Sequence, residues 1–314
     1  MLAPEKRRMT LGTAAPTAHT AEKYQAAPLP QREPPFDAAK RVLLGLAYAV
    51  QPQRLPDVPY VLIWTALDLL RGRTEIPHPD RTRNRPDTFA GVVRNLTPET
   101  YMAAARRGFF PWAHCGPLKW WTRRHRMVLR LPDLHVSRRV KRLLRKGDYR
   151  VTFDTAFADV LAACAAPRDY NWHTLTWLTP RFMQLYADLH RQGFAHSFEV
   201  WNDKNELVGG GFGVAFGGIF IGESMFSREP DTSKLGFAVL VAHLKAWGFT
   251  AIDGRDHTPV MERQGFRLIP HAEFDALLHA NARMPDRLGP WKATQEIAQE
   301  PRGSKGSQPS ASAA

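Results

Sequence analysis

The pattern of apolar and polar positions begins with two short apolar runs near the start of the chain. These runs, RVLLGLAYAV and YVLIWTALDLL, are separated by the polar and proline-containing segment QPQRLPDVP. Each is far shorter than the roughly 20 apolar residues that a membrane-spanning helix needs. We therefore predict two short helices that belong to the protein core.

Two further helices are predicted from their end signals. Thr97 stands where an N-cap is expected, in front of the segment PETYMAAARR, which stops at Gly108. Ser137 precedes a basic segment that stops at Gly147, and its narrow apolar stripe includes Val140. Both segments therefore read as capped helices with one buried face.

The pattern after Arg150 changes to a mixture of strands and helices. A strand and two helices precede three antiparallel strands, and a helix, a strand, a short helix and a last strand follow. The glycines of Gly209-Gly210-Gly211 permit either a turn, which is the commoner explanation, or a close approach of another group. This order predicts an α+β fold and not a doubly wound sheet.

The same order is similar to that of the acyl-CoA N-acetyltransferase (GNAT) fold, which is an analogy at the level of fold only. Such enzymes hold the pyrophosphate of coenzyme A with paired glycines in the turn before a helix. The corresponding turn here reads REPDTSKLG and has no glycine pair. Coenzyme A is therefore disfavoured as the donor, and we expect no cofactor.

Composition and hydropathy divide the chain into four parts. Residues 1–38 and 282–314 are poor in periodic apolar positions and rich in small residues and proline, so we predict flexible ends. Residues 39–125 are assigned to a small N-terminal domain. Residues 126–281 are assigned to the GNAT-like domain.

Targeting and cysteine signals favour the cytoplasm. No apolar stretch of signal-peptide type follows the basic start at Lys6-Arg7-Arg8, and the chain has only two cysteines, Cys115 and Cys164. The histidines show no spacing typical of metal ligands, so we expect no metal site. We also expect a monomer that does not bind membranes.

The net charge of +13 is concentrated in one segment. The stretch from Lys119 to Arg150 contains twelve Lys or Arg residues and two acids, which makes its net charge +10. A concentrated basic patch beside the aromatic pair Trp120 and Trp121 attracts a polyanion, and nucleic acid is the first candidate. The alternative is a solvated basic helix.

Two carboxylates stand where apolar residues would be expected. Strand alternation places Glu223 on the same face as Ile221 and Met225, and a buried carboxylate needs a basic partner or a cationic ligand. Asp253 and Arg255 share a face if their strand continues to Arg255. Neighbouring strands could bring Asp253 close to Glu223.

A set of sequence blocks between Leu96 and Leu278 resembles the leucyl/phenylalanyl-tRNA–protein transferase family. The blocks occur in the family's order and with nearly its spacing: RRGFFPW, KWW, HVSRRVKR, TWLT, LHRQGFAHSFEVW, LVGGGFGV, GESMFSR and AID. The resemblance implies a cytoplasmic enzyme that moves Leu or Phe from aminoacyl-tRNA to the α-amine of a protein beginning with Arg or Lys. The product enters N-degron proteolysis.

The resemblance also implies roles for individual residues. Trp112 and Trp177 match tryptophans that receive the tRNA 3′ adenosine and its amino acid, and Ser224, Met225, Phe226 and Ser227 complete the substrate site. Glu223 matches the site glutamate, and Asp253 matches the aspartate proposed to orient or assist the reacting amine. The basic helix offers a tRNA contact through Arg138, Arg139, Lys141, Arg142, Arg145 and Lys146.

Two departures from the family pattern qualify this assignment. The glycine-rich block expected before FFPW is replaced by RNRPDTFAGVVRNLTP, and about 60 additional residues precede it. Arg255 stands where the family has a glutamine, and a guanidinium is a donor that cannot act as a base. Three hypotheses remain: an active transferase with Arg255 in a salt bridge, a divergent transferase with another acceptor such as an acidic N-terminus, or a tRNA-binding protein without transfer activity.

Overall fold

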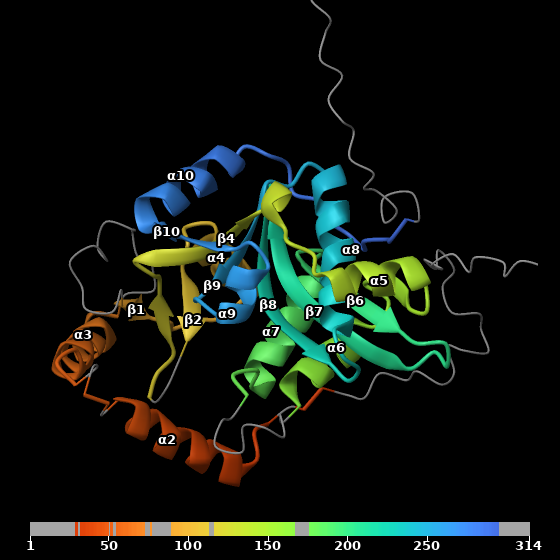
Figure 1. Ribbon diagram of the computed structural model, residues 1–314. Coiled ribbons are helices and arrows are strands. Elements are labelled where there is room, and N and C mark those ends of the chain that lie inside the picture. The colour runs from red at the N-terminus through yellow and green to blue at the C-terminus, as the bar shows by residue number, and fades with distance from the viewer. Residues whose placement is uncertain are drawn as a thin grey trace, which may run out of the picture.

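The computed structural model describes most of the chain between residues 29 and 294. The described residues are 29–30, 32–49, 51–52, 55–72, 76, 89–112, 116–166 and 176–294. Within them, a seven-stranded sheet and a three-stranded sheet are surrounded by helices (Figure 1). The predicted α+β class is therefore confirmed.

The seven-stranded sheet has the order β10-β4-β9-β8-β7-β6-β5. Its strands are β4 (His125–Arg130), β5 (Arg150–Phe153), β6 (Ala195–Trp201), β7 (Leu207–Phe216), β8 (Ile219–Ser227), β9 (Ala251–Arg255) and β10 (Arg267–Pro270). All its neighbouring strands are antiparallel except β8 and β9. The helix α8 (Thr232–Ala246) connects these two parallel strands.

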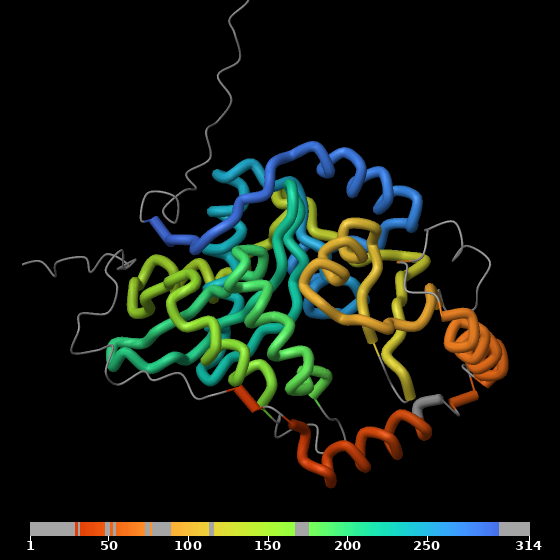
Figure 2. The backbone as a smooth tube through the Cα atoms, turned by 180° about the vertical axis from the view of Figure 1, so that it is seen from behind, coloured from red at the N-terminus to blue at the C-terminus, as the bar shows by residue number. Residues whose placement is uncertain are grey.

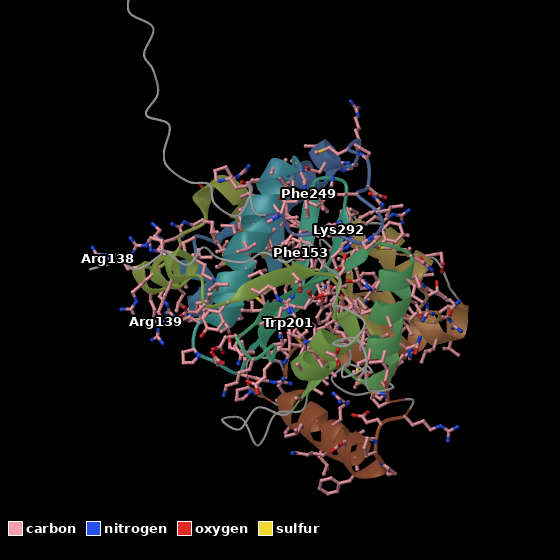
Figure 3. All side chains as sticks on the ribbon, turned by 90° about the vertical axis from the view of Figure 1, so that its right-hand side faces the viewer. Arg138, Arg139, Phe153, Trp201, Phe249 and Lys292 are labelled. Carbon is pink, nitrogen blue, oxygen red and sulfur yellow. The ribbon has the colours of Figure 1, made fainter. Side chains whose placement is uncertain are left out.

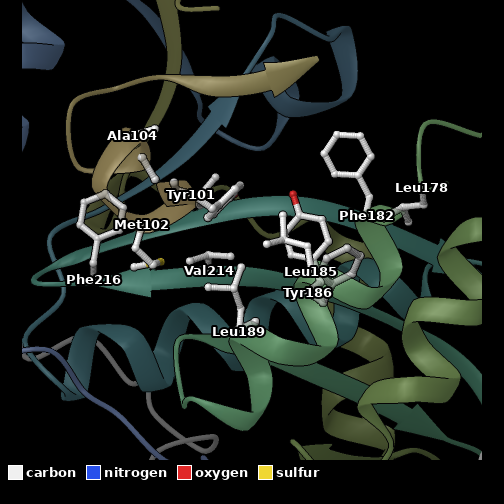
Figure 4. Packing of buried hydrophobic residues seen from close by; sticks show 14 of the residues in the cluster. Tyr101, Met102, Ala104, Leu178, Phe182, Leu185, Tyr186, Leu189, Val214 and Phe216 are labelled. Atoms are coloured by element: carbon white, nitrogen blue, oxygen red, sulfur yellow. The ribbon is translucent and has the colours of Figure 1, made fainter. Parts of the chain in front are cut away.

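Helices cover both faces of this sheet. One face packs against α4 (Pro98–Ala105), α6 (Phe157–Ala165), α7 (Pro180–Arg191) and α10 (His271–Asn281). Figure 4 shows the side chains of α4 and α7 meeting over the strands. The other face packs against α8 and α5 (Arg138–Lys146). The sheet is thus the middle layer of the domain.

The three-stranded sheet lies at the other end of the molecule from α5 and α8 (Figures 1 and 2). Its order is β1-β3-β2, from β1 (Phe89–Val92), β2 (Phe110–Trp112) and β3 (Lys119–Trp121). Beside it lies α3 (Val58–Arg71), and α2 (Pro35–Ala49) follows the lower edge of the molecule. A 3-10 turn η3 (Leu131–Asp133) and the short helix α9 (Pro259–Arg263) complete the described elements.

The capped helices predicted from the sequence are confirmed. Thr97 caps α4 through a capping box, in which its side chain accepts a hydrogen bond from the backbone of Thr100. Ser137 caps α5, and Gly147 ends it in the left-handed conformation with φ of +73°. These signals are local, so they fix helix ends without help from tertiary contacts.

The structure differs from three predictions about the ends of the chain. The two N-terminal apolar runs are helices, but α2 and α3 expose most of their large apolar side chains and are not core. The tail predicted to be flexible from residue 282 is packed up to residue 294, since Trp291 is buried and stacks on His196. Helix α2 begins at Pro35, inside the predicted extension, and residues 1–28 lie outside the described part.

The triple glycine is not a turn but part of β7. A Cβ at Gly209 would lie 2.4 Å from the Thr232 hydroxyl, and one at Gly211 would lie 2.6 Å from the Met225 side chain. Such distances forbid any side chain there. The glycines therefore allow α8 and β8 to approach the strand closely.

Among the described helices, none is long and apolar enough to cross a membrane. Cys164 is buried on α6, whereas Cys115 lies outside the described residues.

Candidate functional site

The candidate site lies where the two parallel strands of the large sheet separate. β8 pairs with β9 only from Ile219 to Ile221, opposite Ala251 to Asp253. β8 is buried up to Ile221 and partly exposed from Gly222 onward. The strand ends beyond this point carry Glu223 and Arg255, so both residues lie at the opening between them.

A β-bulge positions Glu223. On the β7 side, Phe212 pairs with Ser224 and Gly213 pairs with Gly222, so Glu223 is the extra residue of β8. The bulge reverses the alternation beyond it, which corrects the predicted shared face of Ile221 and Met225.

The reversed alternation separates two residues expected to line one apolar pocket. Met225 packs with the core on the α8 side of the sheet, whereas Phe226 packs with the core that contains Ile221 and Trp177. Phe226 therefore lies on the side of the tryptophan, and Met225 does not. Ser224 is partly buried, and Ser227, which is exposed, donates a hydrogen bond to Ser233 at the start of α8.

Glu223 is bound by a guanidinium and a phenol. Its Oε1 accepts hydrogen bonds from Arg255 Nη2 and from the Tyr101 hydroxyl, each at 2.5 Å. The Glu223 side chain is 0% exposed, yet its Oε2 and Arg255 Nε have no hydrogen-bond partner among the described residues. One oxygen of the carboxylate is thus engaged and the other is not.

The same contacts shift the ionisation of the partners of Glu223. Burial, and then the negative charge of Glu223, raise the pKa of Tyr101 far above its ordinary value, so the phenol keeps its proton and donates. Burial, the largest single influence, would lower the pKa of Arg255, but Glu223 together with Tyr101, Tyr186 and Asp253 outweighs it, so the pKa rises. Arg255 is therefore a permanent cation neutralised by Glu223.

Asp253 is held by a different arginine. Arg126 on β4 donates two hydrogen bonds to its carboxylate, Nε to Oδ1 at 2.9 Å and Nη2 to Oδ2 at 2.7 Å, and both side chains are 1% exposed. The backbone N–H of Arg255 donates to the same Oδ1 at 2.8 Å. Asp253 is therefore a fully engaged acceptor, and it fixes the backbone of Arg255 in the left-handed conformation with φ of +60°.

Arginines surround the ring of Phe110 on β2. The guanidinium carbons of Arg123, Arg126 and Arg255 lie 4.9, 5.3 and 5.2 Å from the ring centroid. Arg123 pairs in turn with Asp256 at 2.5 Å. Each of the three cations thus has its own carboxylate, and the ring fills the space between them.

The two predicted site tryptophans are brought together. The rings of Trp112, at the end of β2, and Trp177, before α7, have centroids 6.0 Å apart and are tilted by 36°. Trp177 also contacts Tyr186 at 5.9 Å, and Tyr186 contacts Tyr101 at 5.7 Å. This aromatic series connects the tryptophan pair to Glu223.

The six basic residues predicted to contact tRNA are all exposed on α5. Figure 3 shows Arg138 and Arg139 projecting from one edge of the molecule. Arg139 pairs with Asp231, which precedes α8, at 2.9 Å. Helix α5 therefore lies beside the C-terminal end of β8, beyond the candidate site on that strand.

Sequence reasoning missed three residues of this site. Arg126 belongs to the predicted basic segment, and Tyr101 and Tyr186 lie in predicted helices without a predicted role at the site. The signal for Arg126 was a charged residue within the apolar strand HRMVLR, which requires a buried partner. No group of three or more potential metal ligands occurs in the described part of the chain.

Comparisons with known proteins point to one family. The family model described as leucyl/phenylalanyl-tRNA protein transferase matches residues 128–279, and that of its N-terminal domain matches residues 94–124. A leucyl/phenylalanyl-tRNA–protein transferase of Stutzerimonas stutzeri (strain A1501) is 43% identical over 226 residues, which cover 72% of this chain and 98% of the relative. One of Pseudomonas syringae pv. tomato is 45% identical over 207 residues, which cover 66% of this chain and 89% of the relative.

Solved structures add little to this assignment. A functionally unknown conserved protein from Staphylococcus epidermidis ATCC 12228 is 15% identical, with a TM-score of 0.31 over 46% of this chain and 57% of that chain. A score this low does not assign the fold.

Proposed function

The chain belongs to the leucyl/phenylalanyl-tRNA–protein transferase family, and we propose that its acceptors are proteins that begin with Arg or Lys. The enzyme transfers Leu or Phe from aminoacyl-tRNA to the N-terminal α-amine of an acceptor protein. The pairing of Glu223 with Arg255 carries the proposal for a basic acceptor. It neutralises the guanidinium that would repel a basic N-terminus, and the buried Glu223 Oε2, which has no hydrogen-bond partner among the described residues, would gain one when a cation enters the site.

The transfer step needs little chemical activation from the protein. The neutral α-amine attacks the ester carbonyl of the aminoacyl-tRNA, the new C–N bond forms, and the ester C–O bond breaks. The amine loses a proton and the tRNA 3′ oxygen gains one. An α-amine has a pKa near 8, so part of it is neutral at pH 7, and positioning then supplies much of the rate.

We assign Asp253 a positioning role in this step. Its two oxygens accept hydrogen bonds from Arg126 and from the backbone of Arg255, so a proton on it would break a buried ion pair. Asp253 then orients β9 and Arg255 toward Glu223. Glu223 contacts the reacting amine or the basic acceptor residue through Oε2.

The donor end is assigned to the aromatic residues. We propose that Trp112 and Trp177 stack on the 3′ adenosine and the aminoacyl group, because aromatic rings bind unpaired bases by stacking. Phe226 lies on the same side of the sheet and supplies apolar surface for Leu or Phe. Met225 faces away and supports β8 from behind.

The exposed basic helix is assigned to the tRNA. Its six Lys and Arg residues lie on a short helix beside the end of β8, where they can neutralise phosphates of the acceptor stem. Because aminoacyl-tRNA is a cytoplasmic donor, we propose that the enzyme acts in the cytoplasm, and its product enters N-degron proteolysis.

We propose a GNAT-like arrangement for the large domain. The separation of two parallel strands, with a bulge on the first and a helix connecting them, supports this assignment. The donor nevertheless differs from that of acetyltransferases, since the turn before α8 has no glycine pair.

A donor assay tests the proposal. Purified protein is incubated with a peptide beginning with Arg and with labelled Leu-tRNA, Phe-tRNA or acetyl-CoA, and label on the peptide is measured. We expect transfer from the two aminoacyl-tRNAs only. Label from acetyl-CoA alone would overturn the proposal, and tRNA binding without transfer to any peptide would favour a binding protein.

A further inference from the structure

Exposed apolar side chains gather on the two N-terminal helices. Among the described residues, thirteen large apolar side chains are highly exposed, and ten of them lie between residues 36 and 70. They include Leu43 at 68%, Leu62 at 63% and Leu70 at 83%. This segment precedes both regions matched by the family models, which start at residue 94.

These side chains follow the helical repeat. On α2 the exposed apolar positions are 36, 39, 42, 43, 46 and 47, and on α3 they are 59, 60, 62, 63, 66, 69 and 70. Steps of three and four residues place them on one stripe of each helix. Small alanines at positions 39, 47 and 66 allow another helix to approach closely.

The opposite side of α3 anchors it to the protein. Val61 and Trp64 pack against the cluster formed by Phe89, Phe110 and Trp121, and Thr65 is buried. Arg94 Nη2 donates hydrogen bonds to the backbone oxygens of Asp68 and Leu69 at 3.1 and 2.5 Å. The outward direction of the apolar stripe is therefore fixed by the fold.

Among the described residues, no side chain of α2 belongs to one of the hydrophobic clusters. The helix runs along the edge of the molecule (Figure 1), and Arg41 forms an ion pair at 2.6 Å with Glu33, in the segment just before the helix. A helix of 15 residues is only marginally stable in water without tertiary packing. Packing of its apolar stripe against a partner surface would therefore stabilise this helix.

We propose that α2 and α3 form a dimer interface with a second copy of this chain. Ten side chains that are each about half exposed present on the order of 1,000 Å² of apolar surface. A standard interface buries about 800 Å² on each partner, so the two stripes are large enough for a stable dimer. The structure thereby argues against the monomer expected from the sequence.

Charge favours a protein partner over a lipid surface. Between residues 29 and 72 the chain has five basic and four acidic residues, so this segment is almost neutral. Helices that bind in a membrane interface typically carry many Lys and Arg residues on the polar face. The near balance here suits a self-complementary contact, in which the same patch meets itself.

The interface leaves the proposed tRNA surface free. Helix α3 lies at the end of the molecule opposite α5 in both views of the backbone, and α2 runs along the lower edge (Figures 1 and 2). A dimer through α2 and α3 can therefore bind one tRNA on each copy. The inference does not depend on the proposed function.

Sedimentation equilibrium of the full chain tests the dimer. We expect a mass that shifts from monomer to dimer with concentration, and Leu43→Glu and Ile63→Glu should each raise the dissociation constant by roughly 30-fold or more, as at other interface hot spots. Leu288→Glu is the matched control, because Leu288 is similarly exposed, at 54%, but lies on the C-terminal segment. It should leave the mass unchanged.

Three outcomes would overturn the proposal. The first is a protein that stays monomeric at all concentrations, and the second is a dimer whose dissociation constant neither substitution changes. The third is a monomer that co-sediments with phosphatidylcholine vesicles, because its apolar stripes would then bind lipid. The substituted positions are on the surface, so the variants should remain folded and retain transfer from Leu-tRNA. Transfer measured on Leu43→Glu therefore separates this inference from the proposed function.

Discussion

Replacing Asp253 with asparagine should destabilise the protein strongly. The substitution keeps the size of the side chain but removes the charge that balances Arg126, and both groups are 1% exposed. A buried guanidinium without its carboxylate cannot be solvated by water, and breaking such a pair costs about 3–5 kcal/mol. Two charge-assisted hydrogen bonds are weakened at the same time.

A second ion pair on the same two segments provides the control. Asp256 pairs with Arg123 at 2.5 Å, but these side chains are 60% and 30% exposed. Water can replace the lost partner there, so Asp256→Asn should cost only about 0–1 kcal/mol. The contrast isolates burial, since both substitutions remove one carboxylate that pairs with an arginine.

The assay is urea unfolding followed by tryptophan fluorescence. We expect the free energy of unfolding to fall by about 3–5 kcal/mol in Asp253→Asn, and the double variant Arg126→Met/Asp253→Leu should recover most of this loss because it leaves no buried charge. A loss below about 1 kcal/mol in Asp253→Asn, equal to that of Asp256→Asn, would refute the account of Asp253 as a structural partner.

Three further predictions concern other parts of the molecule. Burial raises the pKa of Glu199 to about 7 from an ordinary 4.5, although hydroxyls of Ser197, Thr152 and Thr155 donate to it. The stabilising effect of the protonated Glu199 is complete below about pH 4.5 and is lost as the pH rises through 7. The free energy of unfolding should therefore fall by about 3 kcal/mol over this interval. In urea titrations, Glu199→Gln should abolish this dependence of the unfolding free energy on pH. The double variant Arg142→Ala/Arg145→Ala should reduce the slope of log binding constant against log salt by about 1.5 in filter binding of tRNA. Trp177→Ala should raise the KM for Leu-tRNA by roughly 5- to 150-fold, because stacking on one base contributes about 1–3 kcal/mol; an unchanged KM would remove this residue from the donor site.

Local signals in the sequence were sufficient for the helices but not for the site strand. Thr97 and Ser137 cap their helices by contacts within a few residues, so their roles can be read from sequence. Alternation along β8 failed at Glu223, since one extra residue in a bulge reverses every later side chain. A bulge depends on the partner strand, which alternation in one strand does not reveal.

Partnerships across the fold were also beyond sequence reasoning. Arg126 and Asp253 are separated by 127 positions, and only the pairing of β4 with β9 brings them together. The predicted salt bridge of Arg255 is confirmed, but its partner Glu223 had to be found among several acids. For α2 and α3, apolar periodicity predicted the helices but not which surface covers their apolar side.

The acceptor preference tests the central claim most directly. Initial rates of Leu transfer from Leu-tRNA are compared for two peptides that differ only in an N-terminal Arg or Glu. With Arg255 neutralised by Glu223, we predict that the Arg peptide reacts at least about tenfold faster, which corresponds to about 1.4 kcal/mol. Faster transfer to the Glu peptide would contradict the account, because it would mean that the charge of Arg255 acts on the acceptor.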